Sequence, residues 1–220
     1  MDTLSKRCAD SLRVFSENQG VKLGASHAHE IVAAFVGYNS NAAMRADKFC
    51  PIENLNKADI YVLVPSALID QRRQSLKGLP SDLPDTYTLG EALASEIGEV
   101  FRGRVFPSFT NLSEVLTGEY LQIHGRSMLP ASFGPFERAH VIFSKPLYEF
   151  SPSIDHTNDG VTLIVANRYY GSVNAHFQSI DVTITMKLKR VAGYVGYTLS
   201  DISAERRAGI DGRPAEPKRA

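Results

Sequence analysis

Val182-Thr183-Ile184-Thr185-Met186-Lys187-Leu188 decides the fold of the C-terminal half of this 220-residue chain. Apolar residues occupy every second position, and the residues between them are polar. Because successive side chains of a β-strand point to opposite faces, this alternation predicts a strand with one apolar and one wet face. A shorter alternation in residues 161–165 predicts a second strand, and residues 171–175 predict a hairpin connection between the two. We therefore expect an antiparallel sheet from residue 139 onward.

The N-terminal part carries a helical period instead. Apolar residues recur at helical spacing over residues 3–18, and Gly20 lies where a helix would end. Ser26 is a good N-cap for a second helix that ends at Gly37, and Ser40 caps a third helix through about Lys48. These predictions give a three-helix N-terminal unit.

The middle of the chain is expected to be mostly helical. Residues 58–64 are rich in β-forming side chains and lead into a helix-compatible stretch at residues 67–77. Helical periodicity returns at residues 87–101 and again at residues 112–123. The fold class that follows is α+β, with a helical N-terminal unit, a helical middle and a C-terminal antiparallel sheet.

Three regions follow from these patterns. Residues 1–50 form a helix-turn-helix-like unit, and residues 51–203 form an α+β domain that ends in the sheet. Residues 204–220 have no apolar periodicity and are expected to be a disordered tail.

Charge and composition exclude several classes of protein. Lys plus Arg equals Asp plus Glu at 24 each, so no global field attracts nucleic acid, and such binding must come from a local patch. Cys8 and Cys50 have no metal-binding or disulfide-framework spacing and are expected to be buried thiols. The sequence lacks a signal-peptide core and a run of roughly 18 apolar residues, so we expect a soluble cytoplasmic protein that contacts no membrane.

Ala33, Gly37, Ser40 and Ala43 have the spacing of a helix-turn-helix, with small residues at the crossing and a glycine in the turn. If the third helix binds DNA, its exposed polar groups are Asn41, Arg45 and Lys48, which would reach base edges or phosphates. A plain helical hairpin gives the same pattern through packing alone, so both interpretations stay open.

The histidines predict no metal site and no cofactor. His27 and His29 lie two residues apart on a helix, so their side chains diverge. The remaining histidines have no ligand spacing among themselves.

Gly125-Arg126-Ser127-Met128-Leu129-Pro130 resembles the serine motif of the serine/lysine peptidases, the family of bacterial signal peptidases and self-cleaving repressors. Leu188-Lys189-Arg190-Val191-Ala192-Gly193 resembles the lysine motif of that family. The resemblance implies Ser127 as nucleophile and Lys189 as general base, which requires a lysine whose pKa burial has lowered. The Gly-Asp pair that usually follows the serine is replaced here by residues 132–136.

A broader resemblance covers Ser26-His27-Ala28-His29-Glu30, the Gly37-Tyr38-Asn39-Ser40 turn, residues 68–73 and 83–85, and residues 190–193. These residues are similar to a family of uncharacterised proteins of plasmids and integrative conjugative elements of Gram-negative bacteria. The Ser-His-Ala-His-Glu helix is also similar to a module that precedes some glyoxalase-like domains. The resemblance implies a protein carried by a mobile element and implies no activity.

Together these observations predict a non-enzymatic accessory protein of a bacterial mobile element that binds a protein partner or DNA. The alternative is a soluble serine/lysine peptidase that uses Ser127 and Lys189. The sequence leaves the partner and the oligomeric state open.

Overall fold

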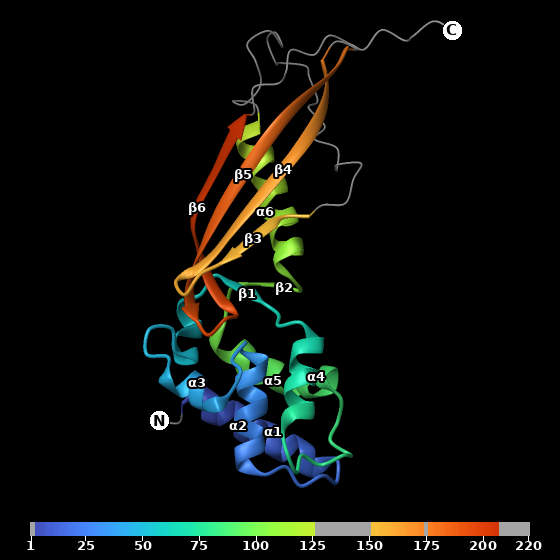
Figure 1. The fold of residues 1–220 in the computed structure, drawn as a ribbon, viewed down its shortest axis with the longest axis vertical. Helices are drawn as coiled ribbons and strands as arrows, with labels where there is room; N and C mark the ends of the chain where they lie inside the picture. The colour runs from blue at the N-terminus through green and yellow to red at the C-terminus, as the bar shows by residue number, and fades with distance from the viewer. Residues whose placement is uncertain (1–2, 126–150, 174–175, 207–220) are drawn as a thin grey trace, which may run out of the picture.

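The computed structural model describes residues 3–125, 151–173 and 176–206. A bundle of short helices forms one end, and a long twisted sheet with one helix along its face extends from that bundle (Figure 1). The α+β class predicted from the sequence is therefore confirmed.

The helical unit begins with the three predicted helices. Thr3 caps the first of them by accepting a hydrogen bond from the backbone N–H of Lys6, and Ser40 caps the third in the same way. Gly20 and Gly37 have φ of 80° and 85°, the left-handed conformation that glycine adopts without a Cβ penalty, and each follows the end of a helix. The elements of the unit are α1 (Leu4–Asn18), α2 (Ala25–Phe35), α3 (Asn41–Ala46), η1 (Ile52–Lys57), α4 (Ser66–Ser75) and α5 (Thr86–Val100).

One apolar core extends through the whole helical unit and past the predicted boundary at residue 50. Leu12 of α1, Ile31 of α2 and Leu89 of α5 are fully buried in it, and so is Leu55 of η1. The predicted division at residue 50 does not match this packing, because helices that are distant in the sequence bury their apolar faces against α1 and α2. The core includes Val195, which lies in the turn that connects the last two strands of the sheet. The helical unit and the sheet are therefore joined by packing.

The sheet has six strands in the order β2-β1-β6-β5-β4-β3. Its long strands are antiparallel, as predicted, whereas β1 and β2 pair in parallel with each other at one edge. Strand β2 was not predicted, because it is only three residues long. The strands are β1 (Ile60–Val62), β2 (Arg104–Phe106), β3 (Ser153–His156), β4 (Gly160–Val173), β5 (His176–Ala192) and β6 (Gly196–Arg206).

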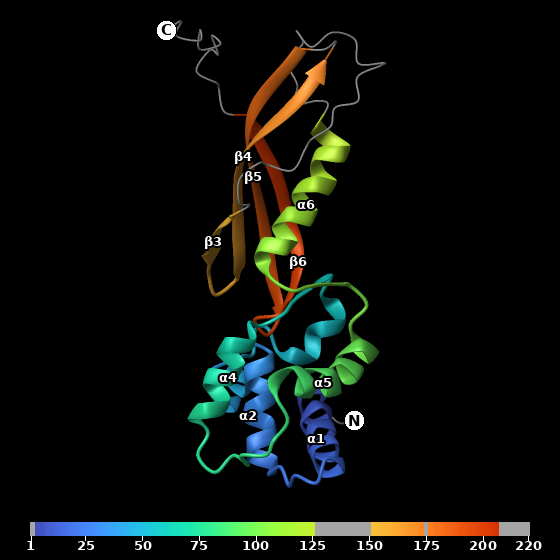
Figure 2. The same ribbon diagram turned by 90° about the vertical axis from the view of Figure 1, so that its right-hand side faces the viewer.

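Helix α6 (Phe109–His124) packs along one face of this sheet (Figure 2). Val182, Ile184, Met186 and Leu188 of β5 are all buried beneath it, which confirms the predicted apolar face. The alternation of the sequence therefore identified the buried side of the strand correctly.

Two predicted boundaries shift in the structure. The β4–β5 pairing continues through Val173 and His176, so the hairpin connection is shorter than the predicted 171–175. Strand β6 continues to Arg206, whose backbone pairs with Val182, so the first residues of the predicted tail belong to the sheet. Backbone pairing orders these residues although their sequence has no clear apolar alternation. The strand expected near residues 141–143 lies outside the described residues.

Among the described helices, none combines the length and the apolar character that crossing a bilayer requires. Cys8 and Cys50 are buried free thiols, as expected, and burial raises the pKa of Cys8 to about 12.

Candidate functional site

A buried ion pair joins the helical unit to the sheet. The Nη1 of Arg190 in β5 lies 2.8 Å from Oδ2 of Asp47, which directly follows α3, and their side chains are only 7% and 10% exposed. The hydroxyl of Tyr38 donates to the same carboxylate oxygen at 2.7 Å. The Arg190 guanidinium also stacks over the ring of Tyr194, 4.4 Å from its centre. Both charges are therefore paired and hydrogen-bonded where water is largely excluded.

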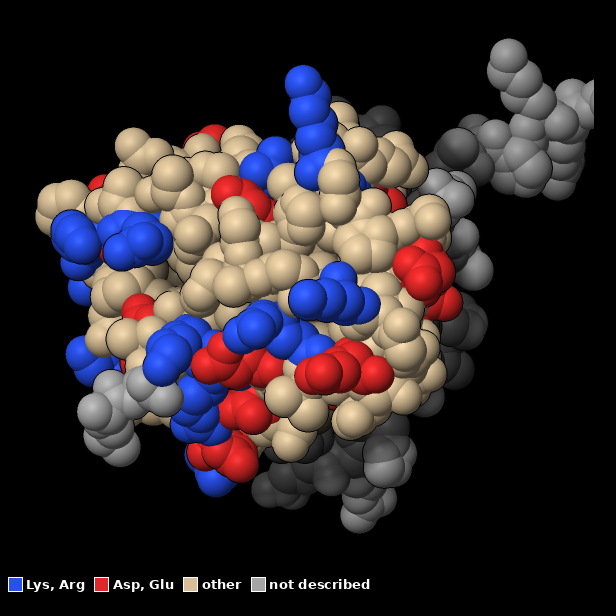
Figure 3. Space-filling view, turned by 90° about the horizontal axis from the view of Figure 1, so that it is seen from below, with Lys and Arg blue, Asp and Glu red and all other residues tan. Residues whose placement is uncertain are grey.

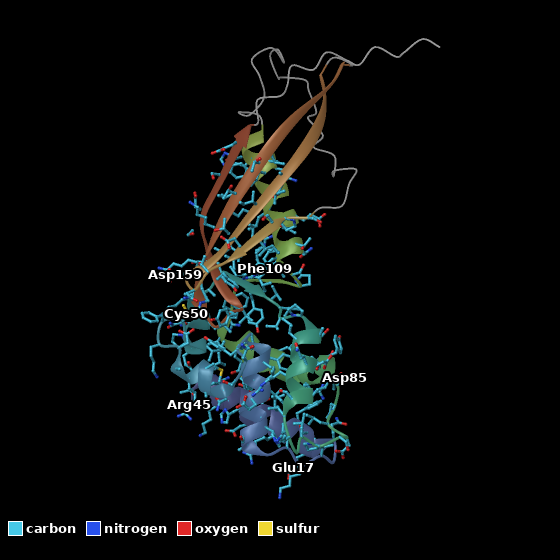
Figure 4. All side chains as sticks on the ribbon, in the orientation of Figure 1. Glu17, Arg45, Cys50, Asp85, Phe109 and Asp159 are labelled. Carbon is cyan, nitrogen blue, oxygen red and sulfur yellow. The ribbon has the colours of Figure 1, made fainter. Side chains whose placement is uncertain are left out.

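Backbone contacts hold the β5–β6 turn against the helical unit beside this pair. The N–H of Gly193 donates to the carbonyl of Cys50, and the N–H of Tyr194 donates to the carbonyl of Val36. A Cβ on Gly37 would lie 2.6 Å from the Cβ of Tyr194, so only glycine permits this approach. Cys50 appears beside Asp159 at this junction in Figure 4, and the Arg190 N–H donates to the Asp159 carbonyl.

The surroundings of Asp47 keep it ionised. Burial by itself would raise the pKa of Asp47, but the N–H of Cys50, the hydroxyl of Tyr38 and the charge of Arg190 together lower it below the ordinary value. The other oxygen, Oδ1, accepts from the backbone N–H groups of Phe49 and Cys50 at 3.1 and 3.0 Å. Asp47 thus fixes the turn over residues 47–50 from inside the protein.

A depression of about 490 Å³ lies beside this turn, between α3, η1 and the start of α1. Three cations and two carboxylates line it, and Arg190 already neutralises one of these carboxylates, Asp47. The remaining charge is positive, which suits an anionic ligand. The charged residues of the lining are Lys6, Arg45, Asp47, Lys48 and Glu53.

The structure brings the predicted residues Asn41, Arg45 and Lys48 together around this depression. Arg45 and Lys48 are exposed, and no ion pair engages either of them within the described residues. Arg45 lies on the outer side of the helical unit in Figure 4. Asn41 is half-buried, and its backbone N–H donates to Glu30, which forms an ion pair with Arg72. This contact is made by the backbone, and the side-chain Oδ1 of Asn41 is buried without a hydrogen-bond partner among the described residues.

Helix α3 is shorter than predicted. It ends at Ala46, so Lys48 lies beyond it in the turn that Asp47 fixes. The following residue, Phe49, is 91% exposed, the highest exposure among the large apolar side chains described. Sequence reasoning did not single out Phe49, although its place outside any apolar periodicity was a usable signal. The buried Asp47–Arg190 pair gave no such signal, because 143 residues separate its members.

The free end of the helical unit is not uniformly basic. Lys and Arg lie among Asp and Glu over this surface, as the view from below shows (Figure 3). Any attraction of an anion must therefore come from local groups such as Arg45 and Lys48.

Ser127, the nucleophile of the serine/lysine hypothesis, lies outside the described residues. Lys189 is exposed on β5, opposite Thr198 and Gly160. Lys189 therefore does not lie in the buried setting that the peptidase interpretation requires. Helix α6 starts beside Tyr197, near the Lys189 end of the sheet, and extends about 24 Å from there.

No group of three or more His, Cys, Asp or Glu side chains is placed to hold a metal ion in the part of the chain that the structure describes. His27 contacts the carbonyl of Lys77, and His29 lines the depression beside α3.

Comparison with known proteins found no match: no family model, no curated protein and no solved structure is similar to this chain.

Proposed function

We propose that this protein binds nucleic acid, and that Arg45 and Lys48 contact its phosphate backbone. The observation that supports this most directly is the depression beside α3, where these two exposed cations lie together and Arg190 neutralises Asp47, one of the two carboxylates of the lining. Cations that pair with phosphates release counterions from the nucleic acid, which favours binding. Such a protein would serve as a non-enzymatic accessory factor of a bacterial mobile element.

The geometry of α3 favours phosphate contacts over base recognition in the major groove. The helix has six residues and is about 9 Å long, so it presents less than two turns to a groove. Asn41, the residue best suited to bind adenine, is half-buried at the start of the helix. Binding through this surface is therefore expected to depend on charge more than on sequence.

The test is a titration of labelled oligonucleotides by fluorescence anisotropy across a salt series. The double variant Arg45→Ala, Lys48→Ala is compared with the charge-matched control Lys22→Ala, Lys77→Ala. The control cations lie near the start of α2, whereas α3 follows its end. If each cation contacts one phosphate, the double variant lowers the slope of log K against log salt by about 1.4 to 1.8, and the control lowers it little.

Two results would contradict the proposal. The first is the absence of binding at low salt, which would leave a protein partner as the occupant of this surface. The second is an equal loss in the double variant and in the control, because the binding would then follow net charge and not this site. Labelling by a serine-reactive probe that is lost in Ser127→Ala would instead support the peptidase hypothesis.

A further inference from the structure

Phe49 carries the most exposed large apolar side chain among the described residues. Its ring is 91% exposed, so it adds almost nothing to either core. The next most exposed aromatic of the described residues, Tyr87, is 76% exposed but hydrogen-bonds through its hydroxyl to Glu91. A phenylalanine ring has no polar atom and gains no hydrogen bond from water. Single exposed apolar side chains are common on proteins, so it is the place of this ring beside the exposed Arg45 and Lys48 that makes it a candidate contact for another molecule.

The backbone beneath this ring is held in one conformation. Asp47 accepts from the N–H of Phe49 and from the N–H of Cys50, and the same carboxylate is fixed by Arg190 and Tyr38. Cys50 is buried, and its carbonyl accepts from the N–H of Gly193. A ligand that binds the ring does not need to order this turn, so less conformational entropy is lost on binding.

The chemistry around the ring is that of a single-strand binding surface. Lys48 directly precedes Phe49, and both Lys48 and Arg45 line the positively charged depression beside α3. Proteins that bind single strands combine cations that follow the phosphates with aromatic rings on which bases stack. In a duplex the faces of the bases are covered by neighbouring bases, so a ring reaches a base face only by unstacking a step, which costs free energy that an unpaired base does not require.

We propose that Phe49 stacks on an unpaired base while Arg45 and Lys48 contact the adjacent phosphates, so that the ligand is single-stranded nucleic acid. This inference rests on the proposed function and specifies its ligand class. The short α3 is consistent with it, since a single strand can bend around a helix that is too short to fill a groove.

The test uses the whole protein with oligo(dT) and oligo(rU) of about 16 nucleotides and a duplex of the same length. We expect Phe49→Ala to weaken single-strand binding on the order of ten- to a hundredfold, the effect of removing one base stack. We expect Phe49→Tyr to bind like the wild type, because the ring remains. Tyr87→Ala is the control for the loss of an exposed aromatic ring, and a difference between the two oligonucleotides would separate DNA from RNA.

A second readout reports directly on stacking. The chain contains no Trp, so the tryptophan emission of a Phe49→Trp variant comes from position 49 alone. Oligo(dT) is expected to quench this emission at the concentrations at which it binds, and a ring with a purely structural role would not respond.

The outcomes separate this inference from the proposed function. Salt-dependent binding that Arg45→Ala, Lys48→Ala weakens and Phe49→Ala leaves unchanged would overturn the stacking role and keep the phosphate site. A preference for the duplex over both single strands would also overturn it. The absence of binding to all three probes would overturn both proposals.

Discussion

Removal of the Asp47 carboxylate is expected to destabilise the whole protein. In Asp47→Ala the Arg190 guanidinium stays buried without its counter-charge, two backbone N–H groups lose their acceptor, and the Tyr38 hydroxyl keeps only the Cys50 carbonyl at 3.4 Å. Breaking a buried ion pair from one side costs about 3 to 5 kcal/mol. For a chain of this size, a loss of about 4 kcal/mol lowers the Tm by roughly 8 to 16 °C. Urea denaturation followed by circular dichroism measures the change in the free energy of unfolding.

A double-mutant cycle shows whether the pair itself is responsible. Arg190→Met removes the charge and keeps an apolar side chain of similar length beside Tyr194. We expect Asp47→Ala, Arg190→Met to be more stable than Asp47→Ala alone, because no unpaired charge remains. A loss below about 1 kcal/mol in Asp47→Ala, or strictly additive effects in the cycle, would refute a stabilising role of this pair at the junction.

The pH dependence of stability should also report on the Asp47 carboxylate. Folding lowers the pKa of Asp47, so the stabilisation by its carboxylate is complete above the ordinary carboxyl pKa of about 4 and is lost as the pH falls below it. In Asp47→Asn the free energy of unfolding, measured by urea denaturation at a series of pH values, should therefore fall less steeply at acid pH than in the wild type. Parallel pH profiles of the two proteins would contradict this. Gly37→Ala should lower the free energy of unfolding more than Gly20→Ala does. Both glycines have positive φ, but only Gly37 contacts Tyr194. Thermal denaturation should show a difference of more than about 1 kcal/mol between the two variants. Equal losses would show that the close approach to Tyr194 is not limiting.

The candidate site was predicted in part. Arg45 and Lys48 were identified from helical spacing after the Ser40 cap, and both are exposed as that interpretation requires. Asn41 was expected to be exposed and is half-buried, because Glu30 and Arg72 from other helices pack against the start of α3. Local spacing contains no information about such neighbours.

The sequence by itself determined the local elements. The alternation in Val182 to Leu188 identified the buried face of β5, and Ser40, Gly20 and Gly37 marked helix ends correctly. Ser26 was expected to cap the second helix, but it lies inside α2, whose N-cap is Gly24. These features depend on interactions between residues close in the chain, which a sequence displays directly.

Only the tertiary structure decided where these elements meet. It placed β1 and β2 from the helical half at the edge of the sheet, and it brought Arg190 against Asp47 across 143 residues. That contact fixes the turn that presents Lys48 and Phe49. Burying either charge alone would cost free energy, and the attraction and hydrogen bonds of the pair offset that cost. Whether the two residues meet depends on how distant elements pack and not on their neighbours in the chain.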